Sequence, residues 1–149
     1  MGIQNLVLSI KQMKHLKELG LDITKTALCW TYDDVIKDWN VVPNRKGERQ
    51  IYEWIKDNVF PKITSMYKII PTLTLQEILE LLPSVIIKNY IEYHLYIDYA
   101  EGVVRYSHRN ALALYIYMLQ EIKSDNPLKA AYEMLCWILE NGYLNTNNE

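Results

Sequence analysis

The sequence predicts an α+β domain in which N-terminal and C-terminal helices pack on one face of a small antiparallel sheet. Three observations indicate this class. Apolar residues recur at helical spacing near both ends of the chain, residues 93–108 alternate with a period of two, and residues 24–32 are rich in β-formers. The 149 residues, half of them apolar or aromatic, suffice for one hydrophobic core. We therefore expect a single domain over 1–149.

The first helix is expected over residues 3–19, where apolar side chains repeat at helical spacing and lysines occupy the opposite face. Gly20 follows as the left-handed residue that ends the helix, and Leu21 is placed to contact Leu16. Residues 24–32 then predict a strand that is covered on both faces.

The segment 35–68 shows no sustained period and is expected to be an insertion or an irregular segment. Its candidate element is a short helix over 51–59. After it, Thr74 and Glu77 have the spacing of a capping box, which predicts a helix that runs to Pro83.

Residues 93–108 predict a β-hairpin interrupted at Gly102. A two-residue turn would pair Ile97 with Tyr106, whereas a three-residue loop would pair Ile97 with Arg105. We prefer the two-residue turn because it keeps both apolar sets on one face.

Residues 111–119 are apolar all round, so their periodicity leaves strand and helix open, and we favour a third strand. The last helix is clearer, because Asn126 can cap it, Pro127 suits its first position and Gly142 can end it. Its apolar stripe consists of Leu128, Ala131, Leu135 and Ile138.

Three stretches of the chain carry a resemblance: residues 14–22 (KHLKELGLD), 72–83 (TLTLQEILELLP) and 130–144 (AAYEMLCWILENGYL). Together they resemble a group of small uncharacterised proteins encoded by bacterial phages and mobile elements. The resemblance leaves out the segment from about residue 35 to residue 68. It implies a compact domain with an N-terminal helix, a small sheet and a C-terminal helix, in a setting of accessory genes. It implies no activity and transfers no functional residue.

Charge and motif content exclude several classes of protein. The net charge of −2 and the pI near 5.9 give no overall bias toward the phosphates of nucleic acids or membranes. The longest apolar run is far shorter than the roughly 20 residues of a transmembrane helix, and the N-terminus lacks a signal-type leader, so we expect a cytoplasmic protein. A dinucleotide fingerprint, a P-loop, a nucleophile elbow and a zincin helix are all absent from the sequence. We expect neither a cofactor nor a metal.

Two sets of residues were weighed for chemistry. Cys29 and Cys136 lie far apart in apolar segments, which predicts reduced, buried and unreactive thiols. His94, Asp98 and His108 on the hairpin, with Arg105 as an optional fourth member, could hold a metal or share a proton. A solvated sheet face explains the same alternation and is the preferred interpretation.

The function expected from these observations is that of a non-enzymatic accessory protein that self-associates or binds a protein partner. The chain has 12 Tyr and 4 Trp but 1 Phe, and Tyr and Trp are enriched at protein interfaces. Alternatively, the segment 44–54 could bind nucleic acid through its basic and aromatic residues. A small hydrolase that uses the hairpin is a second alternative. The candidate partner-binding residues are Trp39, Arg45, Lys46, Arg49, Tyr52 and Trp54.

Overall fold

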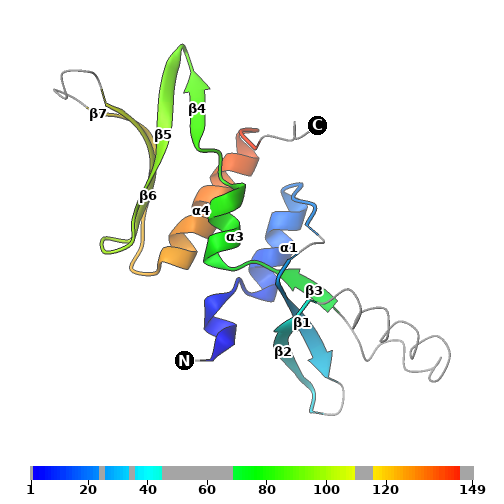
Figure 1. Cartoon of the computed structure of the whole chain (residues 1–149). Helices are drawn as coiled ribbons and strands as arrows, with labels where there is room; N and C mark the ends of the chain where they lie inside the picture. Colours follow the sequence, from blue (N-terminus) through cyan, green and yellow to red (C-terminus); the bar gives the residue numbers. More distant parts are fainter. Residues whose placement is uncertain (1, 24–25, 34–35, 45–68, 110–115, 145–149) are drawn as a thin grey trace. The chain divides into compact units, whose positions relative to one another are not determined.

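The computed structural model describes residues 2–23, 26–33, 36–44, 69–109 and 116–144 (Figure 1). The chain divides into two compact units, 1–74 and 75–149, and each is described by itself. The first unit contains η1 (Ile3–Leu6), α1 (Ile10–Glu18), β1 (Leu28–Asp33), β2 (Asp38–Pro43) and β3 (Ile69–Thr72). The second contains α3 (Leu75–Leu81), β4 (Val85–Lys88), β5 (Ile91–Asp98), β6 (Val103–Arg109), β7 (Ile116–Lys123) and α4 (Pro127–Glu140).

The predicted α+β class is confirmed, because helices occur together with antiparallel strands. The strands differ from expectation in forming two sheets. The order is β2-β1-β3 in the first unit and β4-β5-β6-β7 in the second. The single domain expected over 1–149 stays a prediction.

The first helix begins later than the apolar spacing predicts. Its N-cap is Ser9, whose hydroxyl accepts a hydrogen bond from the Gln12 amide, while the Gln12 side chain accepts one from the Ser9 amide. Just before this cap, the Leu8 amide donates to the carbonyl of Leu73 at 3.0 Å, and Val7 forms a β-bridge with Thr74. The backbone of these two residues is therefore paired with another segment, which interrupts the helix that the spacing alone predicts.

The predicted end of the first helix is confirmed. Gly20 has a φ of 98°, a backbone conformation that favours glycine. The Leu21 amide donates to the carbonyl of Leu16 at 3.0 Å, as the Schellman pattern requires.

Strand β1 lies at the centre of the first sheet, where antiparallel pairing with β2 and β3 covers both of its edges. It corresponds to the strand predicted for 24–32, but it begins at Leu28. Strand β2 falls in the segment 35–68 that was expected to be irregular, because pairing with β1 organises a sequence with little strand signal of its own. Residues 45–68, which include the helix expected over 51–59, lie outside the described residues.

The β5–β6 hairpin forms as predicted, but neither proposed register is right. Ile97 pairs with Val104 and Asp98 with Val103, which leaves residues 99–102 as the loop. The Asp98 carboxylate accepts hydrogen bonds from the amides of Ala100 and Glu101 at 3.0 and 3.1 Å. This side-chain bonding to the loop backbone stabilises a longer connection than either turn that was weighed.

The strand interpretation of 111–119 is confirmed where the structure describes it, since β7 begins at Ile116 and continues to Lys123. Strand β4 was missed because it is short and stands next to the helix that the apolar pattern extends toward Pro83. It turns into β5 through Asn89 and Tyr90, whose φ values of 52° and 65° make a tight connection.

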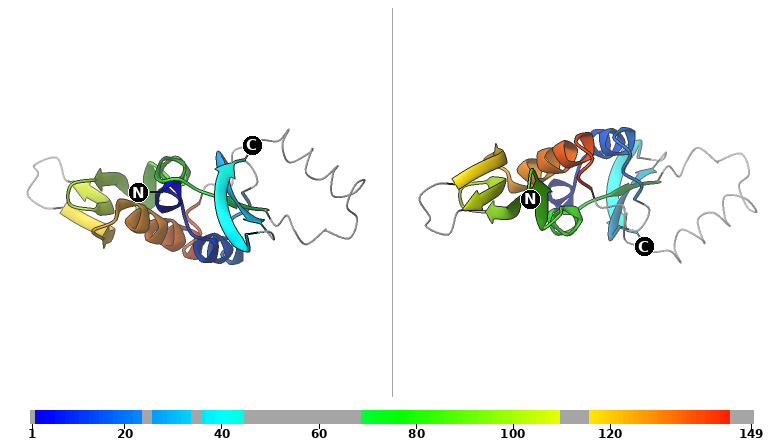
Figure 2. Two further views of the ribbon diagram at one scale, coloured as in Figure 1. Left: turned by 90° about the horizontal axis from the view of Figure 1, so that it is seen from below. Right: turned by 90° about the horizontal axis from the view of Figure 1, so that it is seen from above.

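The last helix matches its prediction closely. The Asn126 side chain accepts hydrogen bonds from the amides of Leu128 and Lys129, and the Tyr143 amide donates to the carbonyl of Ile138 at 3.0 Å. Within the second unit α4 lies against one face of the sheet, where it contacts β6 and β7 (Figure 2). Ala131, Leu135 and Ile138 are fully buried, and Leu128 is partly exposed.

None of the helices in the described ranges is both long enough and apolar enough to cross a membrane.

Replacing Leu135 with alanine should lower the free energy of unfolding by about 2–5 kcal/mol, because the side chain is fully buried and its loss leaves a cavity. The measurement is urea denaturation followed by circular dichroism. Leu128→Ala is the matched control on the same helix and should cost clearly less, since Leu128 is partly exposed. Equal losses in the two variants would contradict this packing of α4.

Gly102→Ala should destabilise the protein far more than Gly142→Ala. Both glycines have a positive φ, 65° and 70°, so each substitution carries a conformational cost of about 1–2 kcal/mol. At Gly102 the added Cβ would also collide with the backbone carbonyl of Ser124, whereas at Gly142 nothing lies within 4 Å. Thermal melting of both variants should show this order, and similar melting temperatures would contradict the close approach of the two loops.

Candidate interaction surface on the four-stranded sheet

One face of the four-stranded sheet is covered within its own unit. Ile86, Val104 and Tyr106 point to this face and are buried. The Tyr106 ring lies 6.4 Å from the ring of Trp137 on α4, and its hydroxyl donates to the carbonyl of Pro83 at 2.7 Å. Burial raises the pKa of Tyr106, so this phenol remains a neutral donor. This face is core.

The opposite face of the sheet has no described element of the second unit packed on it. Strand alternation assigns its side chains, since residues opposite each other in an antiparallel pair share a face. Apolar and charged groups are mixed along it. It presents Ile87 on β4, Glu92, His94 and Tyr96 on β5, Arg105, Ser107 and Arg109 on β6, and Ile116, Met118 and Glu121 on β7. We call this set the open face.

Arg105 occupies the middle of the open face. Its guanidinium carbon lies 4.2 Å from the centre of the Tyr96 ring, a cation–π distance. One of its terminal nitrogens is 3.7 Å from a carboxylate oxygen of Glu121. The side chain is 24 % exposed, and its Nε is buried without a hydrogen-bond partner among the described residues. Arg105 is therefore held in place while part of its donor capacity is unused.

A hollow of about 410 Å³ opens on this side of the sheet, next to Arg105. Three of the residues that line it, Arg105, Ser107 and Arg109, alternate along β6. Most of the described residues that line it have polar or charged side chains, and Glu92 is the acidic one among them. The others are His94, Leu95, Tyr96, His108 and Ile116.

The edge strand β7 carries a run of exposed apolar side chains. Ile116, Tyr117 and Met118 are 43, 47 and 45 % exposed. In the described part of the chain β7 pairs with β6 alone, so its other edge has no strand beside it. An edge of this kind can pair with another chain.

The hairpin residues weighed for catalysis are not brought together as a trio. His94 and His108 both line the hollow, and His108 Nδ1 lies 3.0 Å from the backbone oxygen of Glu92. Asp98 is instead engaged with the loop amides after β5. Across the described residues, no group of three or more His, Cys, Asp or Glu side chains is placed to hold a metal.

Of the six candidate partner-binding residues, the structure describes Trp39. It lies on β2, partly exposed, with its ring 5.3 Å from that of Tyr32. The other five, Arg45, Lys46, Arg49, Tyr52 and Trp54, lie outside the described residues, so this site stays a prediction. The open face as a whole was not predicted as a site, although His94 and Arg105 belong to the hairpin set considered for catalysis and the alternation of Arg105, Ser107 and Arg109 is visible in the sequence.

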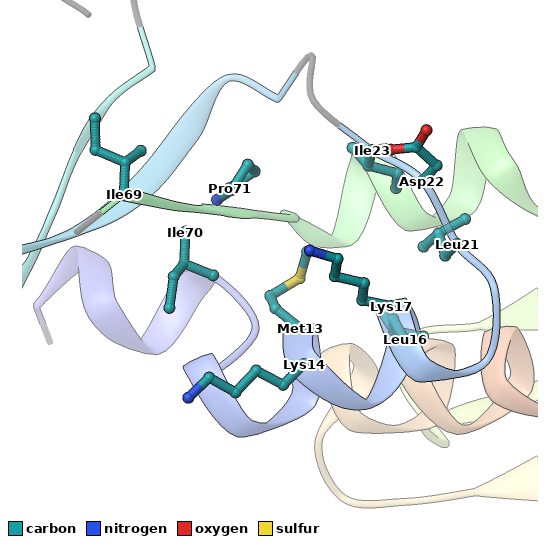
Figure 3. A pocket seen from close by; sticks show the side chains of 10 residues that line it. All are labelled: Met13, Lys14, Leu16, Lys17, Leu21, Asp22, Ile23, Ile69, Ile70 and Pro71. Atoms are coloured by element: carbon teal, nitrogen blue, oxygen red, sulfur yellow. The ribbon is translucent and has the colours of Figure 1, made fainter. Parts of the chain in front are cut away.

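The first unit contains a smaller hollow of about 350 Å³ between α1, the chain just after it and β3. Its walls are largely apolar, and Figure 3 shows Ile70 pointing from β3 toward α1, where Met13 and Leu16 lie. Lys14, Lys17 and Asp22 are the charged members of the lining. They form no pattern that catalysis or metal binding requires.

The two cysteines differ in exposure. Cys29 is buried as predicted, but Cys136 is only partly buried because it lies on α4 outside the stripe that faces the core. Burial raises the pKa of the Cys136 thiol, and a hydrogen bond with Tyr132 partly opposes this shift. A raised pKa lowers the thiolate fraction near neutral pH, and the thiolate is the reactive form.

Comparison with protein-family models, with curated proteins and with solved structures finds no match. The resemblance to proteins of phages and mobile elements stays a prediction.

We expect the native protein to react slowly with a thiol reagent at pH 7, in a phase that belongs to Cys136 and accelerates as the pH is raised. The reason is the raised thiol pKa of this partly exposed residue. Cys29 should react only as the protein unfolds, because it is buried. The Cys136→Ala variant isolates this second phase. Rapid modification of native wild-type protein at pH 7 would contradict the expectation.

Proposed function

We propose that the protein is a non-enzymatic interaction module that self-associates through β7, the edge strand of the four-stranded sheet. The observation that supports this is the run of exposed apolar side chains from Ile116 to Met118 on β7, an edge strand of the described sheet. Sheet edges are usually protected by charges, proline or short length. The first half of β7 carries neither a charge nor proline.

A second copy of this chain fits the edge in one antiparallel register. A two-fold axis between Leu119 and Gln120 would use the whole of β7 on both copies. In this register both members of each outer pair point to the same face of the sheet, as the pairing with β6 assigns them. The pairs are Ile116 with Lys123, Tyr117 with Ile122 and Met118 with Glu121.

The energetics of these pairs are favourable. Tyr117 with Ile122 is an aromatic and β-branched cross-strand pair, a type that contributes about 0.2–1 kcal/mol relative to alanine. Isologous symmetry makes each of the three pairs occur twice, and no two like charges stand directly opposite each other. The sequence of β7 is therefore compatible with antiparallel pairing to β7 of a second copy.

The charge pattern of the open face favours a protein over a nucleic acid as the partner on this sheet. Glu92 and Glu121 are interspersed with Arg105 and Arg109 on that face. A surface that binds the phosphate backbone would instead present a continuous basic stripe. The resemblance to mobile-element proteins supports an accessory role.

Wild-type protein should form a dimer, and Met118→Glu should weaken it by about tenfold or more, which is about 1.4 kcal/mol. In the proposed register the new glutamate stands opposite Glu121 of the other copy, and like charges directly opposite each other are destabilising. The measurement is sedimentation equilibrium over a range of protein concentrations. Met118→Lys should keep the dimer, because a lysine there faces Glu121.

Ile87→Glu is the matched control, since it places the same charge on the same face at the opposite edge strand. It should leave the dimer intact, and the melting temperatures of all three variants should stay near that of wild type, because both positions are exposed. A monomeric wild type would refute self-association. Equal weakening by Met118→Glu and Ile87→Glu would refute pairing through β7.

A further inference from the structure

We propose that the hollow beside Arg105 binds an oxyanion, a phosphate or carboxylate group attached to a small organic molecule. The proposal rests on a juxtaposition within one strand. Arg105, Ser107 and Arg109 follow each other at alternate positions of β6, and all three line the hollow. The donors of this site lie on β6, whereas the dimer proposed above pairs through β7, which contributes Ile116 to the lining of the hollow.

The three residues form a ladder of donors. Alternate residues of a strand point to the same face and lie roughly 7 Å apart along it. Two guanidinium groups thus flank a hydroxyl, all on the open face. Arginine matches the geometry of carboxylate and phosphate oxygens because its planar group can donate two parallel hydrogen bonds. His94, which pairs directly with Ser107 on the neighbouring strand, adds a further polar side chain from β5.

Arg105 has donor capacity that the described structure does not use. Its contact with Glu121 involves one terminal nitrogen at 3.7 Å, and its Nε is buried without a partner among the described residues. A buried donor without a partner costs free energy, so an oxygen acceptor that reaches Nε itself would relieve that cost. Stacking on Tyr96 fixes the group in place before a ligand arrives.

The size and remaining walls of the hollow indicate the class of ligand. Its volume of about 410 Å³ falls within the usual range of small-molecule sites, which is about 300–1,000 Å³, and is more than a bare inorganic ion requires. Tyr96 and Ile116 add apolar surface beside the donors. We therefore assign the hollow to an oxyanion that carries an apolar or aromatic group.

The charged groups at the hollow agree with this assignment. Arg105, Arg109 and Glu92 are the described lining residues that are charged irrespective of the histidines, and Glu121 lies beside Arg105. Arg109 is the guanidinium of the ladder for which no ion pair is described. A hollow with two guanidinium groups among balanced charges can bind one small anion without a general affinity for polyanions.

The experiment is isothermal titration of the full chain with phenyl phosphate and with benzoate, and benzyl alcohol serves as the uncharged control. We expect saturable binding of at least one anion and none of the alcohol. The two anions distinguish a phosphate site from a carboxylate site. The absence of saturable binding of both would overturn the proposal.

Two variants test the location of the site. Arg109→Gln should weaken binding about tenfold or more, as expected for the loss of a charge-assisted hydrogen bond. Lys123→Gln is the matched control, because it removes the same charge from the same face at β7, outside the hollow. Both side chains are exposed, so both variants should keep the wild-type circular dichroism spectrum. Equal weakening by the two variants would overturn the proposal, because it would indicate nonspecific attraction.

Protein concentration separates this proposal from the proposed function, because it changes the oligomeric state without a substitution beside Ser107. If the anion binds equally at concentrations below and above the dissociation constant of the dimer, the site on β6 stands whatever the oligomeric state. If binding requires the dimer while Arg109→Gln leaves binding unchanged, the site is not the ladder on β6 and the proposal fails.

Discussion

The second unit depends on the packing of α4 against one face of the four-stranded sheet. Two small side chains, Ala130 and Ala131, are fully buried on this helix and permit a close approach, while Met134, Leu135 and Ile138 supply buried apolar volume. One helix covers one face of a sheet. The open face and its mixture of apolar and charged groups therefore follow directly from the way the unit builds its core.

The first unit is organised around a backbone group. The carbonyl oxygen of Leu8 accepts hydrogen bonds from Trp30 Nε1 at 2.8 Å and from the Thr72 hydroxyl at 2.7 Å. These donors belong to β1 and β3, so one buried oxygen links the chain just before α1 to two strands of the sheet. A buried carbonyl without partners is costly, which makes this arrangement specific as well as stabilising. It also explains why the chain leaves the helical path before Ser9.

Arg105 connects the chemistry of the open face to the fold beneath it. The strand residue next to it, Tyr106, is fully buried against α4, so the position of the guanidinium is set by the core. Tyr96 and Glu121, on the two neighbouring strands, then orient the group. A binding group placed on a packed strand is held more precisely than one on a loop. The self-association edge on β7 and the anion donors on β6 share this sheet, and Ile116 belongs to both sites.

The sequence by itself determined the elements whose signals are local. The α4 cap at Asn126, the Gly20 and Gly142 helix ends and the β5–β6 hairpin depend on residues within a few positions of one another, and all four were predicted. The tertiary structure alone decided the rest. The start of α1, the strand β2 and the division of the strands into two sheets arise from pairing between distant segments. The open face was missed for the same reason, because exposure depends on which face a helix covers, and no local pattern of residues records that choice.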